Sequence, residues 1–210
     1  MTSNNYESLN LTQKVSEKDS FTEERYKQFY QFFPKTASTA LDIGCNTGRG
    51  GRVLKQQDSN IEIFGLDCVQ SRLDRLSKDI YKSGIYGLST DIPCEDNSFD
   101  VVVAGELIEH LYPADVDKTL TEIFRVLKLN GKLLLTTPNP LDIKKQIQGR
   151  TVLGGAHLSQ HFPDALALKL RMFGFSSVRI FGSGKVSRYL GYHFPFQRIY
   201  GSYLATGTKF

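Results

Sequence analysis

Short apolar runs alternate along the chain with stretches in which apolar residues recur every three or four positions. The runs cover residues 40–43, 61–66, 101–104 and 133–137. Continuous apolar segments of this length, bounded by polar residues, are typical of parallel strands that are buried on both faces. The pattern therefore predicts four buried strands in the middle of the chain.

The stretches around these runs have the spacing of amphipathic helices. The clearest one covers residues 115–128, where apolar positions fall on one face and Asn130 and Gly131 supply a stop signal. Another covers residues 22–33 and is ended by Pro34, which cannot continue a helix. We expect this helix to cap a site or to pack on the sheet.

Two further helices follow from the same pattern. Leu73, Leu76 and Ile80 have helical spacing and predict a helix that ends near Gly84. Residues 163–173 predict another. Strands and helices that alternate in this order form right-handed crossovers and a parallel sheet with helices on both faces.

The last third of the chain has a different pattern. Apolar runs at 177–181 and 202–208 are joined by an aromatic, glycine-rich segment, which indicates a long connection into a final antiparallel strand. The sequence therefore predicts one α/β domain whose sheet is doubly wound and mostly parallel. We divide the chain into an N-terminal leader with a cap helix at 1–34, of which 1–20 is expected to be loose, and a main domain at 35–210.

Composition and charge exclude several classes of protein. With 40% hydrophobic and 23% charged residues, the 210-residue chain has the composition of a globular domain. Its 26 Lys and Arg are spread among 22 Asp and Glu, so the net charge of +4 is weak evidence for a nucleic-acid or membrane partner. No export signal and no apolar stretch of about 18 residues is present, so no membrane span is predicted.

The three cysteines carry little structural information. Cys45, Cys68 and Cys94 are widely spaced and form no CxxC pair. This spacing predicts neither a disulfide framework nor a cysteine zinc site. We therefore expect a reducing, cytoplasmic environment.

A glycine loop follows the first predicted strand. Residues 41–48 read LDIGCNTG, at the place where open parallel sheets bind ligands. Gly44 and Gly48 allow a tight turn and close approach of a ligand. Their GxxxG spacing differs from the dinucleotide and phosphate motifs, and Asp42 suits a ligand with an ammonium group. A simple glycine turn is the alternative.

Two more carboxylates follow predicted strands. Asp67 ends the second strand, about 20 residues after the loop, where a carboxylate accepts both hydroxyls of a ribose. Asp91 and Ile92 are expected to end a third strand, where they would contact an adenine through an acceptor oxygen and an apolar face. A turn cap is the alternative role for Asp91.

These segments together resemble a known family. LDIGCNTGRG, GLD, STDIPCEDNSFDVVVAGELIEHL and EIFRVLKLNGKLLLTTPNP, within residues 40–140, resemble in order and spacing the signatures of class I S-adenosylmethionine-dependent methyltransferases. The resemblance implies a Rossmann-like, seven-stranded sheet with an antiparallel last strand. Asn46 stands where the family usually has a third glycine, and asparagine tolerates the left-handed conformation that such a position needs.

The resemblance also implies a donor site for S-adenosylmethionine. The glycine loop would hold the methionine part, Asp67 the ribose, and Asp91 with Ile92 the adenine. The full set of implied cofactor-binding residues is Asp42, Gly44, Cys45, Asn46, Thr47, Gly48, Asp67, Cys68, Asp91, Ile92, Gly105 and Glu106.

An ExxEH segment follows the fourth predicted strand. In a helical turn, Glu106, Glu109 and His110 would share one face, and two carboxylates with an imidazole suit Mg, Mn, Fe or Zn. Acids that complement a helix dipole are the alternative. The segment is similar to that of ubiquinone-pathway and small-RNA 3′-terminal O-methyltransferases, which implies an ion, Mg or Mn, and a further ligand at His157, with His161 as the alternative.

Methyl transfer from a sulfonium is an in-line displacement, so the protein mainly aligns the acceptor and removes its proton. We expect Glu109, His110 and His157 to carry this catalysis. The acceptor is expected to be a hydroxyl of a glycan or small-molecule metabolite, with a quinone-like phenol second. RNA 2′-O-methylation comes third because no concentrated basic face is evident.

Two other functions remain open from the sequence. A nicotinamide-dependent oxidoreductase would need a dinucleotide loop, which the GxxxG spacing of the chain does not provide. A catalytically silent S-adenosylmethionine-binding protein would keep the donor residues and lack an acceptor pocket.

Overall fold

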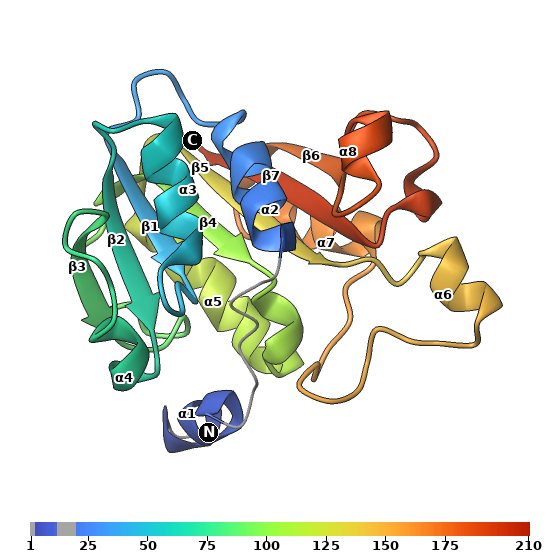
Figure 1. Cartoon of the computed structure of the whole chain (residues 1–210), viewed down its shortest axis with the longest axis horizontal. Helices are drawn as coiled ribbons and strands as arrows, with labels where there is room; N and C mark the ends of the chain where they lie inside the picture. The colour runs from blue at the N-terminus through green and yellow to red at the C-terminus, as the bar shows by residue number, and fades with distance from the viewer. Residues whose placement is uncertain (1–2, 12–19) are drawn as a thin grey trace.

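The computed structural model describes residues 3–11 and 20–210 and contains one seven-stranded sheet (Figure 1). The strand order is β3-β2-β1-β4-β5-β7-β6, and β1 lies between β2 and β4. The strands are β1 (Thr39–Ile43), β2 (Glu62–Asp67), β3 (Tyr81–Tyr86), β4 (Phe99–Gly105), β5 (Leu127–Pro138), β6 (Phe175–Ser183) and β7 (Ser202–Lys209).

Strand direction confirms the predicted fold class. The pairs β1–β2, β1–β4, β2–β3 and β4–β5 are parallel, whereas β7 is antiparallel to both β5 and β6. The order reverses direction on either side of β1, which makes the carboxyl ends of β1 and β4 a topological switch point. Ligands bind at such points in open α/β sheets.

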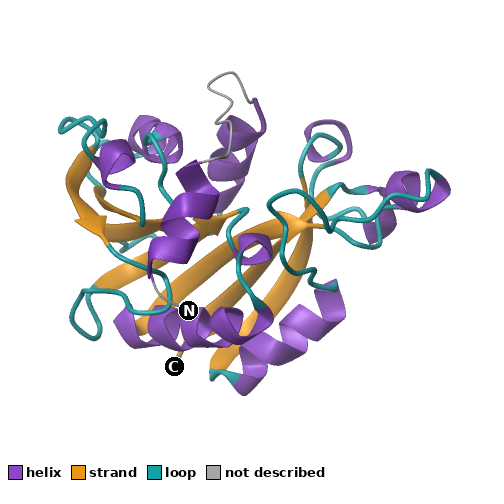
Figure 2. Cartoon of the chain, turned by 90° about the horizontal axis from the view of Figure 1, so that it is seen from below, coloured by secondary structure: helices purple, strands orange, loops and turns teal. Residues whose placement is uncertain are grey.

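Helices cover both faces of the sheet (Figure 2). The longer helices are α2 (Ser20–Tyr30), α3 (Arg49–Gln57), α5 (Pro113–Val126) and α7 (Pro163–Met172). The shorter ones are α1 (Ser3–Leu11), α4 (Gln70–Leu73), η1 (Ile108–His110), α6 (Ile143–Ile147), α8 (Ser187–Leu190) and η2 (Gln197–Ile199). Within the described residues, no helix is long and apolar enough to cross a membrane.

The alternation of side chains along β4 creates two hydrophobic cores. Val101 and Val103 pack with residues of α2 and α3, and Val102 packs with residues of α5 and α7. Phe29 of α2 is fully buried in the first core, and burying such a side chain contributes about 1.5–3 kcal/mol. The expected packing of this helix on the sheet is therefore confirmed.

Three predicted helices end two or more residues earlier than the pattern indicated, and the one expected at 22–33 ends at Tyr30. The helix expected to reach Gly84 stops at Leu73, and Gly84 lies within β3. The helix expected to reach residue 128 ends at Val126, and β5 begins at Leu127. The apolar spacing continues past α4 because Leu76 and Ile80 pack into the core from turns, and past α5 because β5 is a buried strand.

The N-terminal segment also differs from expectation. The loose leader expected at 1–20 contains α1, and Tyr6 of this helix is buried. The Tyr6 hydroxyl donates to Asp115 Oδ2 at 2.7 Å and accepts from the Tyr112 amide at 3.1 Å. Tertiary contacts of this kind stabilise a helix too short to be stable alone. The expectation for 1–2 and 12–19 lies outside the described residues.

Candidate functional site

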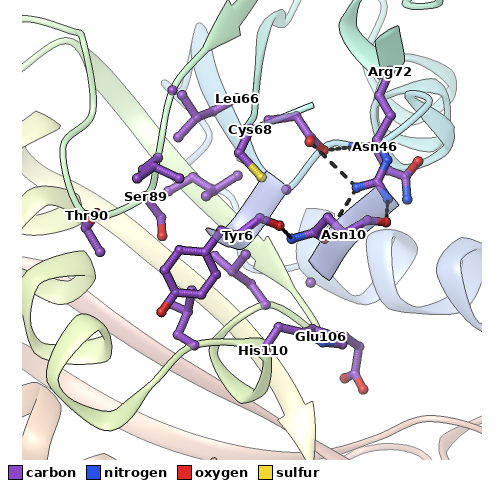
Figure 3. Close-up of a pocket in the computed structure, with 18 residues that line it drawn as sticks. Tyr6, Asn10, Asn46, Leu66, Cys68, Arg72, Ser89, Thr90, Glu106 and His110 are labelled. Atoms are coloured by element: carbon purple, nitrogen blue, oxygen red, sulfur yellow. Dashed lines mark hydrogen bonds and ion pairs between the residues drawn. The ribbon is translucent and has the colours of Figure 1, made fainter. Parts of the chain in front are cut away.

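A cavity of about 200 Å³ opens at the carboxyl ends of β1, β2 and β4 (Figure 3). Its position agrees with the switch point of the sheet. The walls come from five regions: α1, the glycine loop, the loop after β2, the loop after β3, and the segment after β4. The lining residues are Tyr6, Asn10, Ile43, Gly44, Asn46, Leu66, Asp67, Cys68, Arg72, Gly87, Leu88, Ser89, Thr90, Gly105, Glu106, Leu107, His110 and Leu111.

The glycine loop has a left-handed backbone at three alternate positions. Gly44, Asn46 and Gly48 have φ values of 71°, 51° and 84°. The conformation predicted for Asn46 is thus confirmed. The amides of Gly44 and Cys45 both donate to the Leu66 carbonyl, at 2.8 and 3.1 Å, which ties the loop to the end of β2.

Asp67 anchors this loop from the neighbouring strand. Its Oδ2 accepts the Asn46 amide at 2.9 Å, and its Oδ1 accepts the Val69 amide at 2.9 Å. Burial raises the pKa of the Asp67 carboxyl, while the nearby Arg72 guanidinium, 3.6 Å from Oδ1, acts in the opposite direction. Arg72 also donates to the Asn10 carbonyl at 2.7 Å and so connects α1 to Asp67 (Figure 3).

Asp42 lies beneath the loop and does not line the cavity. Its carboxylate accepts the hydroxyls of Tyr26 and Tyr81, each at 2.6 Å, and is fully buried. The Tyr81 hydroxyl in turn accepts the Gly51 amide at 2.9 Å. Asp42 therefore connects α2, α3 and β3 to the strand that carries the loop, and a direct contact with the methyl donor stays a prediction.

We expect Asp42→Asn to change how stability depends on pH. Burial raises the pKa of Asp42 from 3.8 to about 6, although both tyrosine hydrogen bonds act in the opposite direction. The folded state therefore binds the Asp42 proton more tightly than the unfolded state does. The protonated carboxyl thus contributes to stability at low pH, and this contribution is lost as pH rises from about 4 to about 6. The loss corresponds to about 3 kcal/mol.

Urea unfolding at several pH values tests this prediction. As pH rises, the unfolding free energy of Asp42→Asn should increase relative to that of the parent chain. Asp100→Asn is a matched control with the opposite sign. Hydrogen bonds from Ser38, Thr39 and Lys128 outweigh burial and lower the pKa of Asp100, so its contribution is lost as pH falls. A difference for Asp42→Asn that is independent of pH would contradict the assignment.

Buried oxygens without a hydrogen-bond partner surround the loop. They include Asn46 Oδ1, Thr47 Oγ1 and Glu106 Oε1. Glu106 has a left-handed backbone, with φ 53°, and its Oε1 lies 3.7 Å from the Arg25 guanidinium. Buried acceptors of this kind suit a ligand with N–H or ammonium donors, because leaving them unpaired is costly.

The residues expected at the adenine lie in a different place. β3 ends at Tyr86, and the cavity wall beyond it is formed by Leu88, Ser89 and Thr90. Asp91 is exposed and Ile92 belongs to the hydrophobic core, so neither lines the cavity.

The predicted donor residues thus divide into two groups. Those that line the cavity are Gly44, Asn46, Asp67, Cys68, Gly105 and Glu106. Those that do not are Asp42, Cys45, Thr47, Gly48, Asp91 and Ile92. The sequence prediction also missed Tyr6, Asn10 and Arg72, because a polar leader and an isolated arginine carry no motif.

Glu109, His110 and His157 come together beside the cavity. One ligand atom of each lies within 4.8 Å of the others. The rings of His110 and His157 are 4.9 Å apart and nearly perpendicular. Glu109 is buried, with Oε2 accepting the Thr137 hydroxyl at 3.1 Å and Oε1 without a hydrogen-bond partner.

Backbone carbonyls fix the orientation of both imidazoles. His110 Nδ1 lies 3.0 Å from the Ala156 carbonyl, and His157 Nδ1 lies 2.7 Å from the Val152 carbonyl. A carbonyl only accepts, so in each neutral ring Nδ1 carries the proton and Nε2 keeps its lone pair. Burial lowers the pKa of His110, and burial together with the Glu106 charge raises that of Glu109.

The expected helical turn at 106–110 is not formed. Glu106 has a left-handed backbone, and only Ile108–His110 forms a single 3-10 turn. Glu106 therefore lies outside the Glu109–His110–His157 group. His161 is also outside this group, since its Nε2 lies 2.9 Å from Ser159 Oγ and its side chain lines a second cavity of about 410 Å³.

Known relatives are methyltransferases. Residues 41–135 match a family model described as a methyltransferase domain. The demethylmenaquinone methyltransferase of Staphylococcus saprophyticus is 30% identical over 188 residues, which are 75% of this chain and 79% of that protein. That of Lactobacillus johnsonii is 34% identical over 125 residues, which are 55% of this chain and 50% of that protein. The chain spans half or less of the length of the first relatives it matches.

A solved structure has the same fold. The S-adenosylmethionine-dependent methyltransferase of Archaeoglobus fulgidus superimposes with a TM-score of 0.69 at 20% identity, over 89% of this chain and 92% of that one. With the sheet order, the glycine loop and the sequence relatives, this likeness defines the class of protein. The chain belongs to the class I S-adenosylmethionine-dependent methyltransferases.

Proposed function

We propose that the protein transfers a methyl group from S-adenosylmethionine to a hydroxyl of a small molecule or glycan. The observation that carries this proposal is the pair of imidazoles, His110 and His157, each with Nδ1 bound to a backbone carbonyl. Two Nε2 lone pairs next to a buried carboxylate supply a base for an acceptor O–H.

The cavity residues fit the donor part by part. The unpaired oxygens of Asn46 and Glu106 suit the ammonium of the methionine part. Asp67, which already accepts two amides, would also accept ribose hydroxyls. Arg72 would then either move away or keep its ion pair with the same carboxylate. Ser89 and Thr90 replace Asp91 and Ile92 as the proposed adenine neighbours, because they line the cavity.

In the proposed transfer step, the acceptor oxygen exchanges its proton for a methyl group. The acceptor hydroxyl gives its proton to Nε2 of His110 or His157, and its oxygen attacks the methyl carbon. The sulfur–methyl bond breaks in line, and the sulfonium becomes a neutral thioether. Residues that align oxygen, carbon and sulfur contribute most of the rate, since positioning dominates such displacements.

As the alternative to the base role, the same three side chains fit a divalent cation, because a metal would take the two Nε2 lone pairs that the base needs. Two imidazoles and one carboxylate suit Mn, Fe or Zn better than Mg, which prefers oxygen ligands. Glu109, whose pKa is raised by burial, would be held in its ionised form by such a charge. When bound, the ion would lower the pKa of an acceptor hydroxyl. Glu106 and His161 are not part of this proposed ligand set.

A quinone-like phenol is the second candidate acceptor. Three of the sequence relatives are named demethylmenaquinone methyltransferases, which favours a planar acceptor. A phenol needs less assistance from a base than a sugar hydroxyl does, because its pKa is near 10. An RNA 2′-hydroxyl and a catalytically silent donor-binding protein remain the weaker alternatives.

A transfer assay tests the proposal. Isothermal titration should detect binding of S-adenosylmethionine, and labelled donor should then methylate members of a panel of sugars, phenols and amines. We expect oxygen acceptors to react and amines to be inert. With the cation bound, EDTA should reduce turnover and Mn should restore it better than Mg, whereas the histidine base predicts turnover that EDTA does not change. Binding of the donor without transfer to any acceptor class would favour the silent alternative, and full activity after metal removal would reject the cation.

A further inference from the structure

Two long connections leave the sheet at the edge that carries the donor cavity. Residues 139–153 follow β5, and residues 184–201 connect β6 to β7. Pro138 and Ser183, the last residues of β5 and β6, both pair with Ser202 of β7. The connections therefore begin on either side of the start of β7, and α6 and α8 lie at the same end of the molecule (Figure 1).

Hydrogen bonds join the two connections into one unit, which we call the basic lobe (residues 139–153 and 184–201). Asn139 Nδ2 donates to the carbonyls of Gln197 and Tyr200, at 3.1 and 3.0 Å. Lys145 Nζ donates to the Gly201 carbonyl at 3.3 Å, and Arg198 donates to Gln146. These bonds connect α6 and the residues before it with η2, and α8 precedes η2 in the same connection.

The basic lobe exposes an unusual amount of apolar surface. Of the fourteen large hydrophobic side chains that are exposed among the described residues, six belong to the lobe. Ile147 and Tyr189 are each 80% exposed. The other four are Leu153, Leu190, Phe194 and Phe196. A cluster of exposed apolar groups rimmed by polar residues marks an interaction surface.

The charge of the lobe is mainly positive. The whole chain has 26 Lys and Arg against 22 Asp and Glu, but the lobe has six against one. The basic residues are Lys144, Lys145, Arg150, Lys185, Arg188 and Arg198. The one acid, Asp142, is buried and accepts the Lys144 amide at 3.0 Å. Arg188 pairs with Glu24 at 3.2 Å and Lys145 with Asp142 at 4.0 Å, so the other four cations provide most of the available charge.

We propose that the basic lobe binds the surface of an anionic lipid bilayer. Basic residues are attracted to acidic headgroups, and exposed aromatic and aliphatic side chains enter the boundary between headgroups and acyl chains. The aliphatic groups of Ile147 and Leu190 favour a bilayer over RNA, which binds through phosphate contacts and base stacking.

Such binding would orient the enzyme. Because the lobe leaves the sheet at the edge that carries the donor cavity, the same edge would face the membrane. An acceptor dissolved in the bilayer or attached to a lipid would then reach the cavity from that side. This consequence rests on the proposed function, whereas binding of the lobe to lipid does not.

Vesicle sedimentation with the full chain tests the proposal. We expect the protein to bind vesicles of equal parts phosphatidylcholine and phosphatidylglycerol, and to bind phosphatidylcholine alone several-fold less. High salt should reduce binding, because it screens exposed charges. Absence of binding to the anionic vesicles would overturn the proposal, as would binding of RNA in preference to them.

Matched variants locate the surface. Tyr189→Ser with Leu190→Ser, and Lys144→Gln with Lys185→Gln, should each reduce vesicle binding at least several-fold. The controls replace similarly exposed residues outside the lobe and should bind vesicles as the parent chain does. They are Leu129→Ser with Met172→Ser for the apolar pair, and Arg52→Gln with Lys78→Gln for the basic pair.

Two further measurements separate lipid binding from folding and from catalysis. All variants should keep the parent unfolding temperature and affinity for S-adenosylmethionine. Equal loss in the control and lobe variants would reject the assignment of the surface. Vesicle binding without methyl transfer would count against the proposed function and leave the lobe assignment intact.

Discussion

Replacing His157 by alanine is expected to reduce the rate of methyl transfer by about 10²- to 10⁴-fold, the usual contribution of a general base. Its Nδ1 is bound 2.7 Å from the Val152 carbonyl, which leaves Nε2 free to accept the proton of an acceptor hydroxyl. The variant should bind S-adenosylmethionine as tightly as the parent chain does, because His157 does not line the donor cavity.

Rapid-mixing transfer assays and isothermal titration measure these two quantities separately. His161→Ala is the matched control, since His161 is a half-buried histidine of the same segment and lies outside the Glu109–His110–His157 group. Glu109→Gln, which preserves shape and cannot ionise, should lose transfer as well. An unchanged rate in both His157→Ala and Glu109→Gln would remove the group from the mechanism.

Asp67→Asn is expected to weaken S-adenosylmethionine binding by roughly 10- to 100-fold. Hydrogen bonds to a charged group contribute about 1.5–3 kcal/mol each, which corresponds to that range of affinity. The carboxylate holds the amides of Asn46 and Val69 and faces Arg72, so the amide replacement weakens both the loop and the proposed ribose contact.

Asp91→Asn provides the control for this measurement. The sequence pattern assigned both aspartates to the donor site, but Asp91 is exposed and lies outside the cavity lining. We therefore expect its variant to bind the donor as the parent chain does. A large loss in Asp91→Asn with no loss in Asp67→Asn would mean that the donor binds elsewhere.

The strands around the cavity were predictable because burial on both faces leaves a strong local signal. The runs at 40–43, 61–66 and 101–104 are mainly apolar and are followed by Gly44, Asp67 and Gly105, and β1, β2 and β4 form there. The loop conformation at Asn46 was predictable for a similar reason, since few residues tolerate a left-handed backbone.

The predicted helix end and the predicted third strand were wrong in a region where the helical spacing of apolar residues continues beyond the helix. Leu76 and Ile80 continue the helical spacing of Leu73, yet both pack into the core from turns between α4 and β3. This shifted the expected third strand along the chain and moved the predicted adenine contacts to Asp91 and Ile92. The local hydrophobic pattern does not reveal where this strand begins, because strand pairing depends on residues distant in sequence.

The sequence by itself determined the fold class, the family resemblance and the order of the donor-site segments, because strand burial and glycine conformation are local requirements. Only the tertiary structure decided that Glu109 and His110 meet His157, that Asp42 binds two tyrosines, and that α1 forms a wall of the cavity. Each of these contacts joins residues far apart in the chain. Their formation depends on how the packed helices and loops meet, which no single segment encodes.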